Sequence, residues 1–328
     1  MAHELETFAN GQTAFASARL SAWHQLGTIT DDCMSAEDVM VKACLGGWNV
    51  RKIAIQGMEI TERGVTKVDA GDKYMTVRSN PLTGATEYLG IVGADYRVVQ
   101  NEQVTETLNL LVDESGAHFE TAGSMREGKS VFVTMKLPEA MRIADVDDIG
   151  LYLAATTSHD GTASLRLDGT PVRIVCANTQ RLAYRRSRAS YTFRHTSNVT
   201  SKIAEARQAL GLMWTAFEAF QTEAEKMINE TLTMGEFEKI VAQVWPLADD
   251  ASDTAKNNAK QRNSVLRYLV RDADTQKAIK GTRWAGYQAI TEYIDHNAPA
   301  KSDAARATRA LTGAGADLKA RAFELLAV

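Results

Sequence analysis

Arginine and tyrosine side chains crowd the stretch from residue 173 to residue 202, where together they could bind a polyanion. This stretch holds seven Arg and Lys residues and no Asp or Glu, although the whole chain has a formal net charge of −4. Guanidinium groups pair with phosphate oxygens, and aromatic rings stack on exposed bases. We therefore expect the stretch to bind single-stranded DNA or RNA. The candidate contact residues are Arg173, Arg181, Tyr184, Arg185, Arg186, Arg188, Tyr191, Arg194 and Lys202.

The same stretch also allows a structural interpretation. Runs of charge are usually solvated surface, so Tyr184 and Phe193 could belong to the core while the arginines only solubilise a loop. The sequence does not decide the secondary structure of this stretch. On a helix Arg181, Arg185 and Arg188 share a face, whereas on a strand alternate positions do. Helix, strand and loop therefore remain alternatives for this stretch.

A second group of basic residues lies in the segment KNNAKQRNSVLRYLVR, which follows a helical pattern. Acidic residues flank this segment on both sides, and helical surfaces of this kind are common, so we rank it below the first stretch. Its basic residues are Lys256, Lys260, Arg262, Arg267 and Arg271. Further on, we expect Trp284 and Tyr287 to pack in the core rather than to stack on a base.

The residue types that usually support catalysis are scattered along the chain. The six histidines form no HExxH motif and no zinc-ligand set with the three cysteines, which we expect to be reduced thiols. Asp145, Asp147 and Asp148 are close in sequence, but they are typical of an exposed connection before a strand. The glycines of GSMREG lack the spacing and the trailing Lys-Ser/Thr of a phosphate-binding loop. We therefore expect no catalytic residue, no metal site and no cofactor.

The elements that hold the first stretch belong to a predicted α+β fold with a mainly antiparallel sheet. Ser35 and Asp38 resemble a capping box and predict a helix over residues 35–45. Alternating apolar and polar residues predict a strand at 48–57 and two strands around a turn within 73–92.

More elements of this sheet and its helices are expected up to residue 197. Apolar residues at helical spacing predict a helix that begins near a possible Asn101 cap. A hairpin is expected across Glu127-Gly128, and turns at Asp160-Gly161 and at Asp168-Gly169. Together these elements make residues 1–197 a predicted α+β domain.

From residue 198 the composition shifts to helix formers, which predicts an all-helical region over residues 198–328. Apolar residues keep helical spacing from Ile203 to Met227, and this predicts a helix about 45 Å long. Shorter helical patterns lie at Gly235–Val244, Lys256–Arg271, Trp284–His296 and Lys301–Val328.

Neither a membrane span nor an export signal is expected. No apolar run approaches the roughly 20 residues that a helix needs to cross a bilayer. The N-terminal sequence MAHELETFANGQ lacks the basic and apolar regions of a secretory signal. We therefore expect a cytosolic protein without a membrane partner.

Five segments spread over nearly the full length carry a family resemblance. They are WHQLG (Trp23–Gly27), YRVVQN (Tyr96–Asn101), PVRIVCANT (Pro171–Thr179), FRHT (Phe193–Thr196), and the segment that runs from GTRW through TEYIDH (Gly281–His296). In these segments the chain resembles the phage/plasmid-like family, whose members carry domain of unknown function 932. The resemblance implies a protein of a bacteriophage or mobile element, acting in the cytosol of a bacterial host. It provides no catalytic residues.

The order helix, strands and helix over residues 35–115 is also similar to that of phage single-strand annealing proteins, the Erf-like and RecT-like recombinases. This resemblance implies binding of single-stranded DNA along a basic groove and assembly into rings or filaments. We therefore expect a non-catalytic homo-oligomer that binds single-stranded nucleic acid, for example in strand annealing during recombination. The alternative is a phage interaction protein that inhibits a host or defence factor by binding its acidic surface.

Overall fold

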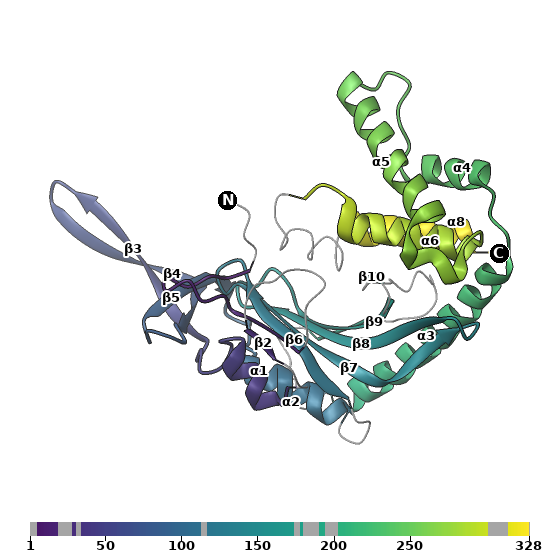
Figure 1. Ribbon diagram of the computed structural model, residues 1–328. Coiled ribbons are helices and arrows are strands. Elements are labelled where there is room, and N and C mark those ends of the chain that lie inside the picture. Colours follow the sequence, from purple (N-terminus) through teal and green to yellow (C-terminus); the bar gives the residue numbers. More distant parts are fainter. Residues whose placement is uncertain are drawn as a thin grey trace.

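Two sheets followed by a group of helices form the part of the chain that the computed structural model describes (Figure 1). The described residues are 5–18, 28–30, 34–112, 117–173, 178–179, 190–193, 203–300 and 314–327. The expected α+β class, with mainly antiparallel sheets and a helical C-terminal region, is confirmed.

The larger sheet contains eight strands within the described residues, and all its pairings are antiparallel except that between β1 and β2. Its order is β10-β9-β8-β7-β6-β1-β2, and β11 also pairs with β9. The strands are β1 (Phe15–Ala18), β2 (Thr28–Thr30), β6 (His118–Met125), β7 (Ser130–Ile143), β8 (Asp147–Ser158), β9 (Leu165–Arg173), β10 (Asn178–Thr179) and β11 (Ser190–Phe193). The expected turns at Glu127-Gly128 and Asp160-Gly161 join β6 to β7 and β8 to β9.

The edge of this sheet beside β9 receives both described pieces of the arginine-rich stretch. β10 pairs with the end of β9 through Asn178 and Arg173, and β11 pairs with its beginning through Ser190 and Asp168. Both short strands run antiparallel to β9, so together they form one interrupted edge strand. Of the three conformations left open by the sequence, these two pieces adopt the strand.

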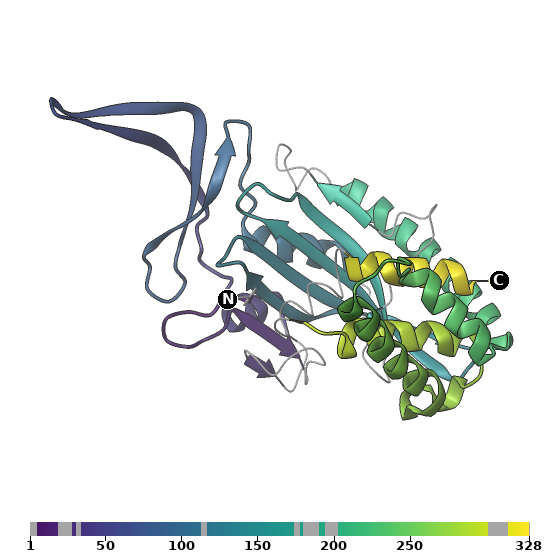
Figure 2. The ribbon, with the colours of Figure 1, turned by 90° about the horizontal axis from the view of Figure 1, so that it is seen from above.

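The smaller sheet has the order β3-β4-β5 and carries a long hairpin that projects from the body (Figures 1 and 2). Its strands are β3 (Arg51–Thr61), β4 (Gly64–Ser79) and β5 (Thr86–Gly93). The pairing of β3 with β4 is irregular between Ala54 and Gln56, and Gly71 on β4 provides a positive φ of 65° at this place. Beyond the irregularity lies the distal arm, residues 56–69, whose two strands pair only with each other.

Three helices cover one face of the larger sheet: α1 (Ala36–Lys42), α2 (Asn101–Val112) and α3 (Ile203–Asn229) (Figure 1). The predicted capping box is present, because Ser35 Oγ accepts the Asp38 N–H and the Asp38 carboxylate accepts the Ser35 N–H, both at 3.1 Å. The Ser35 hydroxyl also donates to the Asp38 carboxylate at 2.8 Å, and this bond together with that of the Ser35 N–H lowers the pKa of Asp38. The long predicted helix is also found: α3 has 27 residues and buries Phe217, Phe220 and Met227.

The remaining helices gather at the far end of α3 (Figure 1). They are α4 (Met234–Val244), α5 (Asp253–Asp272), the 3-10 helix η2 (Asp274–Ile279), α6 (Arg283–Glu292), the π-helical turn η3 (Tyr293–Asn297) and α8 (Ala314–Leu326). At the start of α6 the indole Nε1 of Trp284 donates to the carboxylate of Asp147 on β8 at 2.7 Å. Residues of the sheet and of the helices belong to one hydrophobic cluster.

Three details differ from the sequence-based expectations. Asp147 is buried rather than exposed, because it accepts the hydrogen bond of the Trp284 indole. Asp168-Gly169 forms no turn, because both residues pair with β8 inside a continuous β9. The expected core positions of Trp284 and Tyr287 are confirmed, since neither residue is accessible to solvent.

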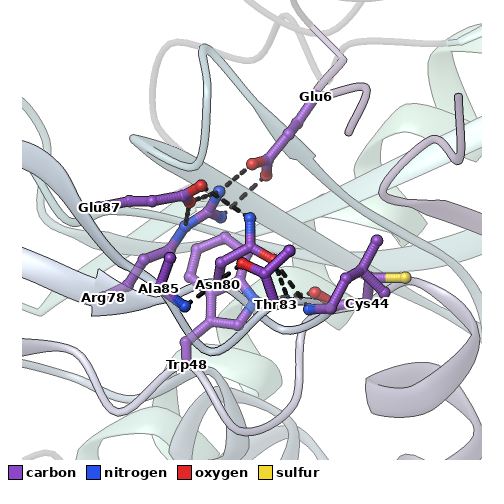
Figure 3. A network of polar contacts seen from close by, with 9 residues as sticks. Glu6, Cys44, Trp48, Arg78, Asn80, Thr83, Ala85 and Glu87 are labelled. Carbon is purple, nitrogen blue, oxygen red and sulfur yellow. Dashed lines mark hydrogen bonds and ion pairs between the residues drawn. The ribbon is translucent and has the colours of Figure 1, made fainter. Parts of the chain in front are cut away.

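A buried arginine joins the smaller sheet to the N-terminal segment (Figure 3). The guanidinium of Arg78 on β4 binds the carboxylate of Glu6 with both terminal nitrogens and that of Glu87 with Nε and Nη2, the latter at 2.9 and 2.8 Å. It lies 4.1 Å from the ring centroid of Trp48, and its side chain is 2% exposed. Burial alone would lower the pKa of Arg78, but the hydrogen bonds and charges of the two carboxylates raise it.

Next to this arginine a second buried polar group joins α2 to the turn after β8. Asn101, the first residue of α2, donates from Nδ2 to the Leu45 carbonyl at 2.8 Å, and its Oδ1 lies 2.9 Å from His159 Nε2. The His159 ring packs beside Trp48, with 5.6 Å between ring centroids. The Asn101 side chain therefore joins three segments, and it lies inside α2 with these bonds in place of the predicted helix cap.

We predict that Arg78→Ala destabilises the protein by about 3–5 kcal/mol, because it leaves the buried carboxylate of Glu6 without its partner. Urea denaturation measures this change. The matched control is Arg142→Ala, which removes an exposed pair with Asp148 and should change stability by less than about 1 kcal/mol. Equal effects of the two substitutions would contradict the role assigned to Arg78.

The contact between the two sheets generates a second prediction. A Cβ atom added to Gly90 on β5 would lie 2.6 Å from the Cα of Asp160, in the turn after β8. Gly90→Ala should therefore push the sheets apart and cost about 1–3 kcal/mol. Gly93→Ala in the same strand is the control, because nothing lies within 4 Å of its added Cβ. Thermal unfolding measures the stability of the two variants. An unchanged melting temperature for Gly90→Ala would refute the close contact.

Candidate nucleic-acid interface

Two of the nine predicted contact residues lie within described elements. Arg173 ends β9, where its backbone pairs with Ile149 of β8 and Asn178 of β10. Tyr191 lies in β11, half-buried, and packs against the main hydrophobic cluster. The other predicted contacts lie outside the described residues: Arg181, Tyr184, Arg185, Arg186, Arg188, Arg194 and Lys202.

The second basic segment forms helix α5, which projects from the group of C-terminal helices (Figure 1). Four of its cations recur at spacings of four, seven and four residues, so they fall within about 60° of arc on one side of the helix. All four side chains are exposed. We call this set the cationic row; it consists of Lys256, Lys260, Arg267 and Arg271.

The four cations differ in their partners. Arg267 donates from Nε to Glu238 of α4 at 2.8 Å, and Arg271 pairs with the adjacent Asp272. The hydrogen bonds that the Arg271 guanidinium donates to the Asp272 carboxylate raise the pKa of Arg271 and lower the pKa of Asp272. Lys256 and Lys260 form no ion pair or hydrogen bond with any other described residue. Their ammonium groups are available to an external anion.

An exposed aromatic ring accompanies the cationic row. Tyr268 follows Arg267 directly and is 57% exposed, although tyrosine is large and partly apolar. It lies beside the row on the solvent side of α5, away from the buried residues Leu266 and Leu269. Cation and ring together reproduce, on this helix, the combination of residue types first noted in the stretch 173–202.

Most of the cationic row can be recognised from the sequence. The spacing of the lysines and arginines indicates a single helical face, whereas Arg262 falls on another side, where its guanidinium lies 5.0 Å from the ring centroid of Trp245. Tyr268 was not singled out, although its place next to Arg267 is the signal that identifies it.

Other kinds of site find no support in the described ranges. There, no group of three or more His, Cys, Asp or Glu residues is placed to hold a metal ion. Within the same ranges no helix combines the length and apolar character that crossing a membrane requires.

Several residues that carry the family resemblance have structural roles. The Tyr96 hydroxyl donates to the Ser158 carbonyl at 3.0 Å, which ties the segment before α2 to the end of β8. The Gln100 side chain bonds the backbone of Val50 twice, at 3.0 and 2.7 Å, like a neighbouring strand. These motif residues hold segments of the fold together.

One comparison with known proteins identifies a family. The model of the family described as "Domain of unknown function (DUF932)" matches residues 88–312, which is more than half of the chain. This range begins within β5, so the distal arm precedes it. No curated protein and no solved structure matches the chain.

Proposed function

The chain belongs to the DUF932 family, and we propose that it is a non-catalytic homo-oligomer that binds single-stranded nucleic acid. The observation that carries this proposal is the cationic row of α5. It concentrates positive charge on a chain of net charge −4, and two of its lysines have no partner among the described residues. A local row of this kind attracts a polyphosphate that the whole molecule would repel.

The dimensions of the row suit a nucleic-acid backbone. Arg271 follows Lys256 by fifteen positions, so the row extends about 22 Å along the helix. Lysines and arginines along such a line neutralise successive phosphates, and the released counterions favour binding at low salt. Arg267 and Arg271 already pair with carboxylates, so Lys256 and Lys260 are the positions of the row most available to phosphates.

A single strand fits this surface better than a duplex. The exposed ring of Tyr268 beside the cations can stack on a base only if that base is unpaired. Each such stack contributes roughly 1–3 kcal/mol. The stretch 173–202 is the second proposed contact, with Arg181, Arg185 and Arg186 on phosphates and Tyr184 on a base.

The distal arm supports the homo-oligomer. Met58 and Ile60 lie on one of its faces and are 69% and 77% exposed, and Val65 lies opposite Ile60. A two-stranded hairpin is marginal in water by itself, so such a surface calls for a partner. Residues 56–69 hold three acidic and two basic residues, a balance that does not suit a polyphosphate.

A second copy of the chain offers a matching surface. At the base of the smaller sheet Ile53, Met75 and Ile91 lie in register across the three strands, and Ile53 and Ile91 are exposed. We propose that this apolar row receives the distal arm of a neighbouring copy. A head-to-tail contact of this kind builds a ring or a filament.

The biological setting follows from the family resemblance and remains part of the proposal. The protein would serve a phage or mobile element in the cytosol of its bacterial host, in recombination or replication. The cations hold one strand with its bases exposed. Base stacking then drives pairing with a second strand, without nucleotide hydrolysis. The alternative, a protein that inhibits a host factor, predicts instead a protein partner that survives nuclease treatment and does not compete with single-stranded DNA.

The proposed nucleic-acid binding generates a prediction about the cationic row. Lys256→Gln/Lys260→Gln should weaken binding of a labelled oligothymidine, because it removes two phosphate contacts. The slope of log affinity against log salt should fall by about 0.7 for each lysine. Fluorescence anisotropy across a salt series measures both effects.

The control for this variant is Lys277→Gln/Lys280→Gln, which makes the same change in charge at two exposed lysines outside α5. It should keep the salt slope of the unmodified protein. Equal slopes for the two double variants would contradict the proposed role of the row. Arg185→Ala/Arg186→Ala tests the second contact by the same titration.

The proposed homo-oligomer generates a prediction about assembly. Met58→Ser/Ile60→Ser should reduce the mass of the particle to that of a monomer in size-exclusion chromatography with light scattering. The melting temperature of the monomer should be little affected, because the distal arm pairs only with itself. Val68→Ser, on the opposite face of the same arm, is the control and should leave the mass unchanged. A monomeric unmodified protein would overturn this part of the proposal.

A further inference from the structure

A pocket opens on the side of α5 that does not carry the cationic row. Its volume is about 570 Å³, within the range of about 300–1,000 Å³ typical of small-ligand sites. The end of α4, the helix α5, the turn η3 and the first turn of α8 enclose it. Its polar and aromatic lining consists of Trp245, Asn258, Gln261, Arg262, Tyr293 and Asn297.

Two aromatic rings and one cation are among the residues that line this pocket. Trp245 and Tyr293 meet edge to face, with 5.8 Å between centroids and an interplanar angle of 84°. The guanidinium of Arg262 lies over Trp245, 5.0 Å from the ring centroid. Among the described residues no Asp or Glu lines the pocket, and burial lowers the pKa of Arg262. The half-buried cation therefore lacks a carboxylate within the lining and favours an electron-rich or anionic ligand.

Two amide side chains also line the pocket. Asn258 and Gln261 lie on the same side of α5 as Arg262 and Val265, at helical spacings of three, four and seven residues. Neither amide forms a hydrogen bond with another described residue. Each carries both donors and an acceptor, as the hydrogen-bonding edge of a nucleobase does.

We propose that this pocket receives one nucleobase extruded from the single strand that lies along α5. The base stacks on the plane of the Arg262 guanidinium, which itself packs on Trp245, and its edge bonds Asn258 and Gln261. Its phosphate stays on the exposed ridge of α5 that carries Tyr268, between the pocket and the cationic row. This inference rests on the proposed function and adds to it a specific site for a base.

The test uses the full-length protein and an oligothymidine with one 2-aminopurine, whose fluorescence reports the environment of that base. Asn258→Ala and Arg262→Gln should each weaken binding about five-fold or more and reduce the fluorescence change on binding. Asn258→Ala should leave the salt slope unaltered, because it removes no charge. Arg321→Gln is the control: it removes an exposed arginine of α8 outside the lining and should behave like the unmodified protein. Thermal unfolding verifies that each variant is folded.

The possible results separate the pocket from the proposed function. If the oligonucleotide binds with the salt slope of the cationic row, but Asn258→Ala and Arg262→Gln leave affinity and fluorescence unchanged, the pocket proposal fails alone. If the unmodified protein binds no oligonucleotide at low salt, the proposed function fails and the pocket proposal falls with it. A loss of affinity and fluorescence change in both variants, with none in Arg321→Gln, supports the pocket.

Discussion

The buried guanidinium of Arg78 is the interaction on which the arrangement of the molecule depends. An arginine is taken out of water only where carboxylates and hydrogen bonds replace its hydration, and here Glu6 and Glu87 do so while Trp48 covers its face. These partners belong to the N-terminal segment, to β5 and to the loop after α1 (Figure 3). By interacting with all three partners, Arg78 fixes the smaller sheet to the body. This sets the direction in which the distal arm projects.

A fixed direction matters because the two proposed working surfaces lie at opposite ends of the molecule. The distal arm extends from one end, whereas α5 and the other C-terminal helices lie at the other end in both views (Figures 1 and 2). Contacts between copies through the arm would therefore leave the cationic row accessible. The larger sheet connects the two ends, since its strands share one core with α3 and α6. In the proposed assembly, contacts between copies and nucleic-acid binding would act together, because each copy would add another row to the same strand.

The sequence predicted those features that depend on nearby residues. The Ser35–Asp38 capping box, the long α3 and the turn at Asp160-Gly161 each follow from a few neighbouring side chains, and so does the cationic row from the helical spacing of its members. The features that the sequence did not predict depend on residues that are far apart along the chain. Glu6 and Arg78 are 72 residues apart, Trp284 and Asp147 are 137 apart, and no local pattern indicates that either pair meets. Asp168-Gly169 has the composition of a turn, but its pairing with β8 decides its conformation.

The central claim is that a single strand lies along α5, and photochemical crosslinking tests it most directly. A bromodeoxyuridine-substituted single strand would be irradiated with the full-length protein at low salt, and the crosslinked peptides mapped by mass spectrometry. The account predicts crosslinks at Tyr268 in α5 that are suppressed by excess unlabelled single strand. Crosslinks confined to other parts of the chain, or none above the level of a non-binding control protein, would contradict it.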